Sequence, residues 1–346
     1  MQNIDFCLSR ILIFTLALLS LGAAHGETVL RYTDHEPYGN MRTRAIQDLF
    51  FSAIEKESNG RVRVEPHWNG ELAISYEALP ALQKGEEADI GIVVPEYSPQ
   101  QLPLFQLFKS FPLGPETGAK QVQFFQKVFH DLPQFNTELA QNNLVNLQFF
   151  LGYPAAFFNT QPGLALNNLK RTTWRTASFW HQAFLEQAGA KVVKMPWNER
   201  ITQALKAGEL NGVLVNLDSG DDIHAQQAAK YVQFSPRLWL GHVYLLVMNK
   251  TRWEALSAED KAAIQRAAQS TQQALGPLLD RSINEMITKM TRQGTEVKRL
   301  TPDALRAWQQ ASQYQQQQKK WLAEKGGKDA EHLLPLIASR LEDAMR

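Results

Sequence analysis

The sequence predicts an α/β protein of two lobes, each built on a parallel sheet covered by helices. Strand and helix patterns alternate in two separate regions, 29–94 and 171–207, and this alternation is typical of parallel sheets. The chain has 346 residues, more than the ~100–200 residues of one ordinary domain. With 44% hydrophobic residues, it has the composition of a packed globule. We therefore expect two domains, with ligand sites at the strand ends.

The first 26 residues are typical of a secretory signal peptide. An apolar run, 11–21, follows Arg10 and precedes small residues at 22–24. The run is shorter than the ~20 apolar residues of a membrane span, so an uncleaved anchor is only the alternative. Cys7 is the one cysteine and would leave with the signal. The mature chain is then predicted to be exported, not membrane-embedded, and without disulfides or thiol chemistry.

Strand and helix patterns of the first lobe follow one another closely. The predicted elements are a strand at 29–32, a helix at 42–58, a strand at 62–65, a helix at 75–84 and a strand at 89–94. Two further helices, 116–130 and 133–142, are separated at Pro133. The strand pattern at 145–151 then leads into the second lobe.

The second lobe repeats the alternation. A Thr- and Trp-rich strand at 171–176 precedes a helix at 179–188 that Gly189 ends. A short strand at 192–195 and a helix at 199–207 complete the pattern. The apolar strand at 243–248 is expected to return to the first lobe.

One long helix is predicted at 257–293. Ser257 is its N-cap, with Asp260 completing a variant of the capping box, and Gly294 ends it. At 1.5 Å per residue its length is on the order of 50 Å, enough to span two lobes. Pro277 lies inside it and is expected to kink it. Helices beginning at Pro302 and spanning 329–345 follow.

Four segments of the chain carry a resemblance to a known family. They are Asn69-Gly70-Glu71-Leu72; 81–85 with 88–91; 168–212, which contains Asn168-Leu169-Lys170, Arg175, Gly189-Ala190, Met195-Pro196, Gly208 and Asn211-Gly212; and 244–256. In this order they resemble the TRAP-transporter periplasmic solute-binding proteins, the DctP family. The resemblance extends over nearly the whole mature chain.

This resemblance implies a two-lobe periplasmic-binding-protein-like fold with a long helix spanning both lobes. The expected division is a signal peptide at 1–26, lobe I at 27–148 and 242–280, and lobe II at 149–241 and 281–346, with the spine helix at 257–293. The implied function is a periplasmic receptor that captures a small organic acid between its lobes and delivers it to the membrane subunits of a TRAP permease. Lobe closure around the ligand would be the mechanism.

Three candidate ligand residues come from the resemblance. The family arginine that matches Arg175 projects from a strand and pairs with a ligand carboxylate through two parallel hydrogen bonds, which suits a planar guanidinium. Trp197 resembles an aromatic residue of the cleft wall, and packing into the core between the lobes is its alternative. Asn216 resembles the cleft asparagine but is offset by one position, which in a strand reverses the side-chain direction.

The segment 152–159 departs from the family pattern. Some relatives that bind sialic acid carry a second cleft arginine there, whereas this chain supplies Tyr153, Phe157 and Phe158. Tyr153 and Phe158 are candidate ligand residues, although at least one of the two phenylalanines is expected in the core. A more aromatic, less cationic wall favours a monocarboxylate with an apolar or aromatic body over a small dicarboxylate.

Other candidates follow strands of the first lobe. His35 and Tyr38 come after the strand at 29–32, and Glu96 comes after the strand at 89–94. Since binding sites in open α/β sheets lie at strand ends, these side chains are expected at the cleft. Helix caps and turns are the alternative role for such residues.

Composition and motifs exclude several other functions. Lys and Arg total 36 against 35 for Asp and Glu, so no global field attracts nucleic acid. The chain lacks GxSxG, Walker and GxGxxG motifs and any HExxH metal pattern. We therefore expect no enzymatic activity, metal or cofactor. A receptor of the same fold that presents its ligand to a sensor kinase is the alternative function, and an exported hydrolase or lyase is a third.

Overall fold

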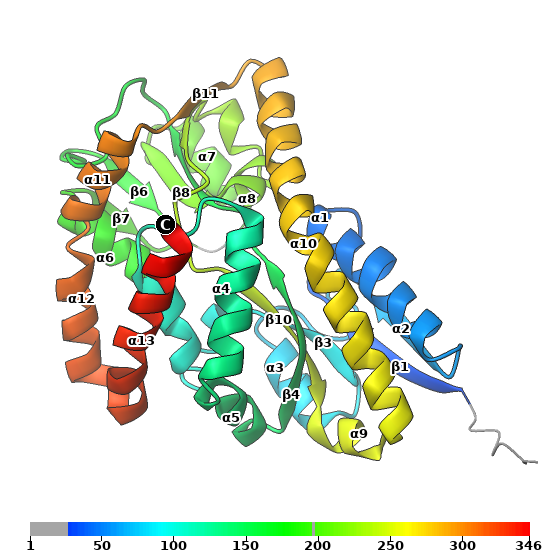
Figure 1. The fold of residues 1–346 in the computed structure, drawn as a ribbon. Helices are drawn as coiled ribbons and strands as arrows, with labels where there is room; N and C mark the ends of the chain where they lie inside the picture. The colour runs from blue at the N-terminus through cyan, green and yellow to red at the C-terminus, as the bar shows by residue number, and fades with distance from the viewer. Residues whose placement is uncertain (1–26, 196–197) are drawn as a thin grey trace, which may run out of the picture.

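The computed structural model describes residues 27–195 and 198–346. Two lobes, each a sheet flanked by helices, lie one above the other in Figure 1, and a long helix runs beside both. The predicted signal peptide lies outside the described residues. No helix within the described part of the chain combines the length and apolar character that a membrane crossing requires.

The sheet of the first lobe has the strand order β2-β1-β3-β10-β4. Its strands are β1 (Thr28–Thr33), β2 (Val62–His67), β3 (Ile90–Val93), β4 (Leu144–Leu151) and β10 (Val243–Asn249). The strands β1, β2 and β3 are parallel, as predicted. The returning strand β10 is antiparallel to β3 and β4, so the sheet is mixed, because the chain re-enters this lobe from the other one.

The sheet of the second lobe has the order β11-β9-β5-β8-β6-β7. Its strands are β5 (Ala155–Asn159), β6 (Thr173–Arg175), β7 (Lys191–Val193), β8 (Gly212–Asn216), β9 (Tyr231–Phe234) and β11 (Glu296–Arg299). Strands β6 and β7 are parallel, as predicted, and β8 is parallel to β6. Strand β5 is antiparallel to β8 and β9, so this sheet is mixed too.

Most predicted helices are present with small changes in their bounds. The α-helices besides the long one are α1 (Met41–Arg44), α2 (Ser52–Glu57), α3 (Ala78–Lys84), α4 (Gly118–Asp131), α5 (Gln134–Gln141), α6 (Phe179–Gln187), α7 (Arg200–Lys206), α8 (Leu217–Asp222), α9 (Lys250–Ala255), α11 (Pro302–Ala311), α12 (Tyr314–Trp321) and α13 (Gly327–Met345). A π-helical stretch, Ala45–Phe51, joins α1 to α2, and a 3₁₀ segment, Leu104–Ser110, precedes α4.

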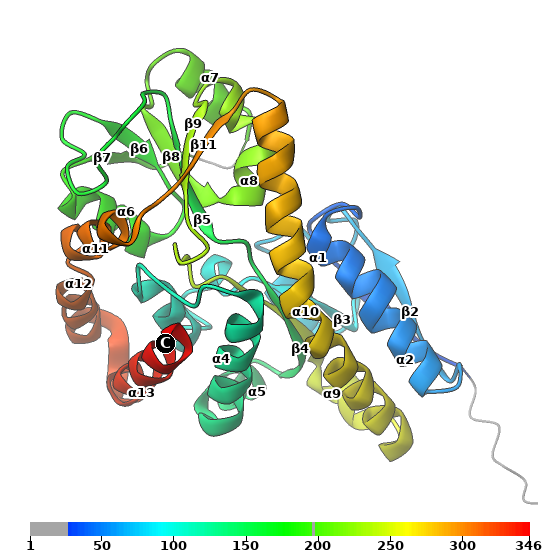
Figure 2. The ribbon, with the colours of Figure 1, turned by 45° about the horizontal axis from the view of Figure 1, so that its top comes forward.

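The long helix α10 (Ala258–Arg292) has 35 residues and runs past both lobes (Figure 2). Its predicted cap is confirmed: Ser257 Oγ accepts from the Asp260 backbone N–H at 3.0 Å and donates to Asp260 Oδ2 at 2.7 Å. Pro277 lies inside the helix.

Helices α4 and α10 cross at a pair of glycines. A Cβ built on Gly118 would lie 2.3 Å from the carbonyl oxygen of Gly276, and one built on Gly276 would lie 2.6 Å from the Ala119 nitrogen. The Gly118 N–H also donates to Asp280 Oδ1 at 2.9 Å. The first lobe is therefore held against α10 beside Pro277, at the level of the cleft.

The last helix departs from the expected division. Helix α13 lies against α4 (Figure 1), where Arg340 forms an ion pair with Asp131 at 3.0 Å. Leu333 and Ile337 share one buried cluster with Phe125 of α4. The C-terminal helix thus packs on the first lobe, whereas 281–346 as a whole was expected in the second.

Candidate functional site

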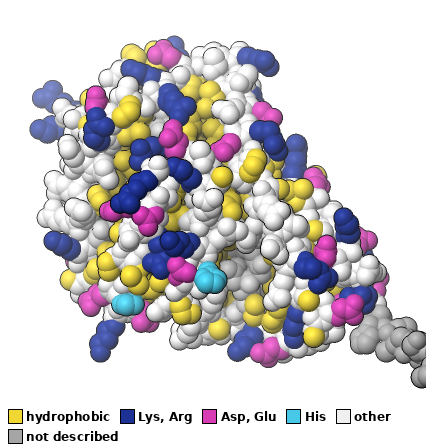
Figure 3. All heavy atoms as spheres, in the orientation of Figure 1, with side chains coloured by type: hydrophobic (Ala, Val, Ile, Leu, Met, Phe, Trp, Pro, Cys, Tyr) yellow, Lys and Arg dark blue, Asp and Glu magenta, His cyan; other side chains and the backbone are white. Residues whose placement is uncertain are grey.

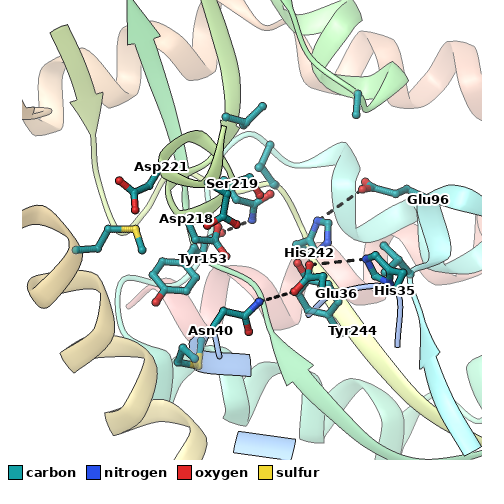
Figure 4. A pocket seen from close by; sticks show the side chains of 18 of the residues that line it. His35, Glu36, Asn40, Glu96, Tyr153, Asp218, Ser219, Asp221, His242 and Tyr244 are labelled. Atoms are coloured by element: carbon teal, nitrogen blue, oxygen red, sulfur yellow. Dashed lines mark hydrogen bonds and ion pairs between the residues drawn. The ribbon is translucent and has the colours of Figure 1, made fainter. Parts of the chain in front are cut away.

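A cleft of about 1700 Å³ lies between the two sheets. Side chains of both lobes and of α10 line it (Figure 4). Ligand pockets usually measure ~300–1,000 Å³, so this cleft is wider than a small ligand fills. Basic and acidic side chains are interspersed over the face of the molecule that Figure 3 shows.

Arg175 is the last residue of β6 and is 4% exposed. Its Nε and Nη2 donate to the carbonyl oxygen of Met195 at 3.1 and 3.0 Å. Burial lowers the pKa of Arg175, while Tyr97 and Glu96, both of the first lobe, oppose that change. The guanidinium therefore lies in the cleft. Its orientation is fixed by the hydrogen bonds to Met195 in its own lobe, and its charge interacts with Tyr97 and Glu96 of the other lobe.

Asn216 ends β8 and is the N-cap of α8, without a capping bond from its side chain. It is 7% exposed, and its Nδ2 donates to the carbonyl oxygen of Tyr153 at 2.6 Å. The hydroxyl of Tyr153 is hydrogen-bonded to Ser282 of α10. These bonds join the second sheet to the segment that crosses between the lobes and to the long helix.

An acidic wall formed by Asp218, Asp221 and Asp222 of α8 follows Asn216. Burial, with the negative charges of Glu36 and Asp222, raises the pKa of Asp218 to about 8. Burial and nearby acids likewise raise the pKa of Asp222 to about 6. Asp221 differs, since Lys289 Nζ pairs with it at 2.5 Å. These three acids were not predicted as site residues. The run DSGDD, which follows a strand, could have indicated them, because ligand sites lie at strand ends.

The first lobe contributes Glu36, which is held by a buried ion-pair network. Arg42 pairs with Asp34 at 2.6 Å and with Glu36 at 2.7 Å, and Asn40 Nδ2 donates to Glu36 at 2.6 Å. Burial would raise the pKa of Glu36, but Arg42 and His35 outweigh it and hold the value at about 2. Burial also lowers the pKa of His35. Glu36 is therefore ionised in the cleft.

Glu96 has a similar partner. Lys109 Nζ pairs with Glu96 at 2.7 Å and contacts His242 Nδ1 at 3.2 Å and the Leu240 carbonyl oxygen at 3.3 Å. Burial would raise the pKa of Glu96, but Lys109 and His242 lower it to about 2. Burial together with Lys109 lowers the pKa of His242 to about 3. The ion pair with Lys109 therefore keeps the Glu96 carboxylate ionised, so that it can accept hydrogen bonds at the cleft.

Exposed aromatic rings surround part of the cleft. Tyr38 and Tyr76 of the first lobe are 49% and 67% exposed, and Phe179 of the second lobe is 41% exposed. Tyr76 packs on Tyr97 with ring centroids 4.7 Å apart. Apolar surface is thus presented by both lobes toward the space between them.

The structure brings together six of the predicted site residues in this cleft: His35, Tyr38, Glu96, Tyr153, Arg175 and Asn216. Phe158 requires a correction, because it is fully buried and its ring packs on Gly220. Both neighbours of β5 are strands and both its faces are covered, so Phe157 and Phe158 enter two different cores. Trp197 lies outside the described residues.

No group of three His, Cys, Asp or Glu among residues 27–195 and 198–346 is arranged to hold a metal ion.

Two mixed α/β lobes, a long helix beside both and a polar cleft between them define the class of two-lobe solute-binding proteins. The chain belongs to family 7 of the bacterial extracellular solute-binding proteins, whose DctP model matches residues 36–320. A solute-binding protein of Chromohalobacter salexigens is 22% identical over 264 residues, which cover 72% of this chain and 73% of the relative.

Solved structures confirm the fold. A marine metagenome TRAP solute-binding protein specific for aromatic acid ligands, in complex with metahydroxyphenylacetate, has a TM-score of 0.78 and 20% identity. The ectoine-binding protein of the TeaABC TRAP transporter, in its apo state, has a TM-score of 0.79 and 18% identity. Each match covers 92% of this chain and 100% of the other. The predicted family and the two-lobe fold with a long helix are thereby confirmed.

Proposed function

We propose that this protein is a periplasmic receptor that captures a small organic acid in the cleft and delivers it to a TRAP-type permease. The observation that carries the proposal is Arg175, a buried guanidinium at the end of a strand in a cleft of this family's fold. A planar guanidinium matches a carboxylate with two hydrogen bonds and keeps its charge at physiological pH. An acid-specific relative of the same fold supports the ligand class.

Binding is expected to close the cleft. The carboxylate would lie on Arg175 of the second lobe, and its body would meet Tyr76 and Tyr97 of the first. Such contacts exist only when the lobes approach, so the ligand favours the closed state by its differential affinity. The closed form would be the one that the permease recognises.

The test is a thermal-shift screen of the mature protein against a library of carboxylates, followed by calorimetry. A ligand at 100 times its Kd should stabilise the protein by about 2.7 kcal/mol. We expect Arg175→Ala to abolish the shift and Arg175→Lys to weaken it, because Lys keeps the charge but not the fork. Arg200→Ala is the matched control, since Arg200 is an exposed arginine of the same lobe outside the cleft. Unchanged affinity in Arg175→Ala would refute the carboxylate role.

Delivery is tested separately. Cells that express a TRAP permease should take up the labelled acid only when this receptor is supplied. Binding without any uptake, in the presence of a permease encoded beside this gene, would favour a sensory receptor instead.

A further inference from the structure

We propose that the ligand is a zwitterion, whose carboxylate lies on Arg175 and whose cationic nitrogen group lies on an acceptor site formed by Asn216, Asp218 and Glu36. The inference rests on the proposed function, because it concerns the second half of the same cleft. It names the ligand class more closely: an acid that also carries an ammonium or amidinium group.

The side-chain oxygen of Asn216, Oδ1, is the first proposed acceptor for the cationic group. The Nδ2 of this side chain is used by the Tyr153 carbonyl oxygen at 2.6 Å, and no described residue donates to its Oδ1. The residue is 7% exposed and lines the cleft. Polar groups of largely buried side chains are normally paired. A ligand N–H group would satisfy this oxygen.

Asp218 provides the second, independent acceptor. Its Oδ1 is buried and has no hydrogen-bond partner among the described residues. Figure 4 shows Asp218, Glu36, Tyr153 and Tyr244 around one part of the cleft. Burial, with the negative charges of Glu36 and Asp218, raises the pKa of Tyr244, so both carboxyls act on the same part of the cleft.

The charge of this region selects a cation. Glu36 and Asp222 are among the groups that raise the pKa of Asp218, so the potential at Asp218 is negative. A second carboxylate would be repelled there, whereas a cationic nitrogen would relieve the repulsion and let Asp218 ionise. Glu36 is already balanced by Arg42, and Asp221 by Lys289. Lys289 and His224 lower the pKa of Asp222, whereas no basic residue is among the groups that act most on Asp218.

Arg175 and Asn216 come from neighbouring strands of the second lobe, whereas Glu36 lines the cleft from the first lobe. Arg175 of β6 pairs with Val213 of β8, and Asn216 lies three residues further along β8. At ~3.3 Å per residue, this is roughly 10 Å along the strand. The spacing of Arg175 and Asn216 is therefore set by one sheet and does not depend on closure, whereas the position of Glu36 relative to them does.

The experiment compares acids with and without an amine at constant shape. The probes are 4-aminobutanoate against butanoate, 6-aminohexanoate against hexanoate, and 3-(aminomethyl)benzoate against 3-methylbenzoate, each measured by calorimetry. At least one amino acid should bind tenfold or more tightly than its partner. Asp218→Asn should weaken that amino acid on the order of 10- to 100-fold, the usual range for a hydrogen bond to a charged group, and should leave the amine-free partner unchanged.

Controls separate the possible failures. Glu186→Gln changes an exposed acid of the second lobe, in α6 and outside the cleft lining, and should have little effect. If Asp218→Asn does not fold, Asp222→Asn tests the same potential. Binding of the amino acid should also release about one proton near pH 7, seen as different heats in two buffers, because the cation lowers the raised pKa of Asp218.

Three results overturn the inference. If the amine-free acids bind through Arg175 as tightly as their amino partners, the acceptor site is wrong while the receptor function stands. If Asp218→Asn strengthens both members of a pair equally, the acid only repels the carboxylate. If no acid of either kind binds, the proposed function fails and the zwitterion inference fails with it.

Discussion

Replacing Glu138 with glutamine should remove the part of the pH dependence of the free energy of unfolding that comes from the ionisation of Glu138. Glu138 lies in α5 and is 7% exposed. Its Oε1 accepts from the Leu104 backbone N–H at 3.0 Å, whereas its Oε2 is buried without a partner among the described residues. Burial raises the pKa of Glu138 from 4.5 to about 7. The folded protein therefore holds this proton over a pH range in which the unfolded chain has lost it.

The sign follows from that difference in bound protons. Because the folded state binds the proton more tightly, Glu138 favours folding below its unfolded pKa, and this advantage is lost as the pH rises from about 4.5 to about 7. The loss corresponds to about 3 kcal/mol, at about 1.4 kcal/mol for each pH unit. Glutamine keeps the acceptor for Leu104 but cannot ionise. It also buries an unpaired amide NH2 group, a constant cost of ~1–3 kcal/mol.

The assay is urea unfolding of wild type and Glu138→Gln between pH 5 and pH 8. Relative to the variant, the wild type should lose about 3 kcal/mol over this range. Subtracting the two profiles removes the other titrating groups, Asp218 and Asp222 among them. Glu331→Gln, an exposed acid in α13, is the control and should parallel the wild type. Parallel profiles for Glu138→Gln would refute the reasoning.

Two further substitutions test the supports of the cleft. Arg42→Met should destabilise the protein by about 3–5 kcal/mol in urea unfolding, because Asp34 would be left as an unpaired buried charge; a loss under 1 kcal/mol would show that Asp34 is neutralised otherwise. Gly276→Ala should cost about 1–3 kcal/mol, because its methyl group would meet the backbone of α4. Gly294→Ala meets no atom within 4 Å but has a positive φ of 88°, so its loss should come from the backbone alone. If Gly276→Ala unfolds at the wild-type urea midpoint, the close crossing is absent in solution.

Local signals in the sequence determined which elements could be predicted. Helix α10 was predictable because Ser257 and Asp260 mark its start and Gly294 its end. Strand β5 was missed, since every residue of AAFFN is buried and the segment has no alternation. The antiparallel entry of β10 was missed for another reason, because strand direction depends on the path of the chain between lobes.

For the candidate site, too, some features could be predicted from local sequence and others depend on tertiary contacts. The family resemblance predicted Arg175 and Asn216, the strand-end rule predicted Glu96, and all three line one cleft. Neither could show that Arg42 holds Glu36, or that Lys109 holds Glu96, because these partners are distant in sequence or belong to another element. Residues that line the cleft are set by local position, whereas their ionisation is set by tertiary neighbours.

Asn216 lies in the cleft although it is offset by one position from the family asparagine. Alternation of side chains holds only while the backbone is extended and paired. Asn216 is the last residue of β8 and also the N-cap of α8, so the chain turns at this position. The Nδ2 bond to Tyr153 O then fixes the side chain at the crossing between the lobes. A one-residue shift at a strand's end can thus be absorbed by the turn, whereas in the middle of β5 the same shift sends Phe158 and Phe157 to opposite cores.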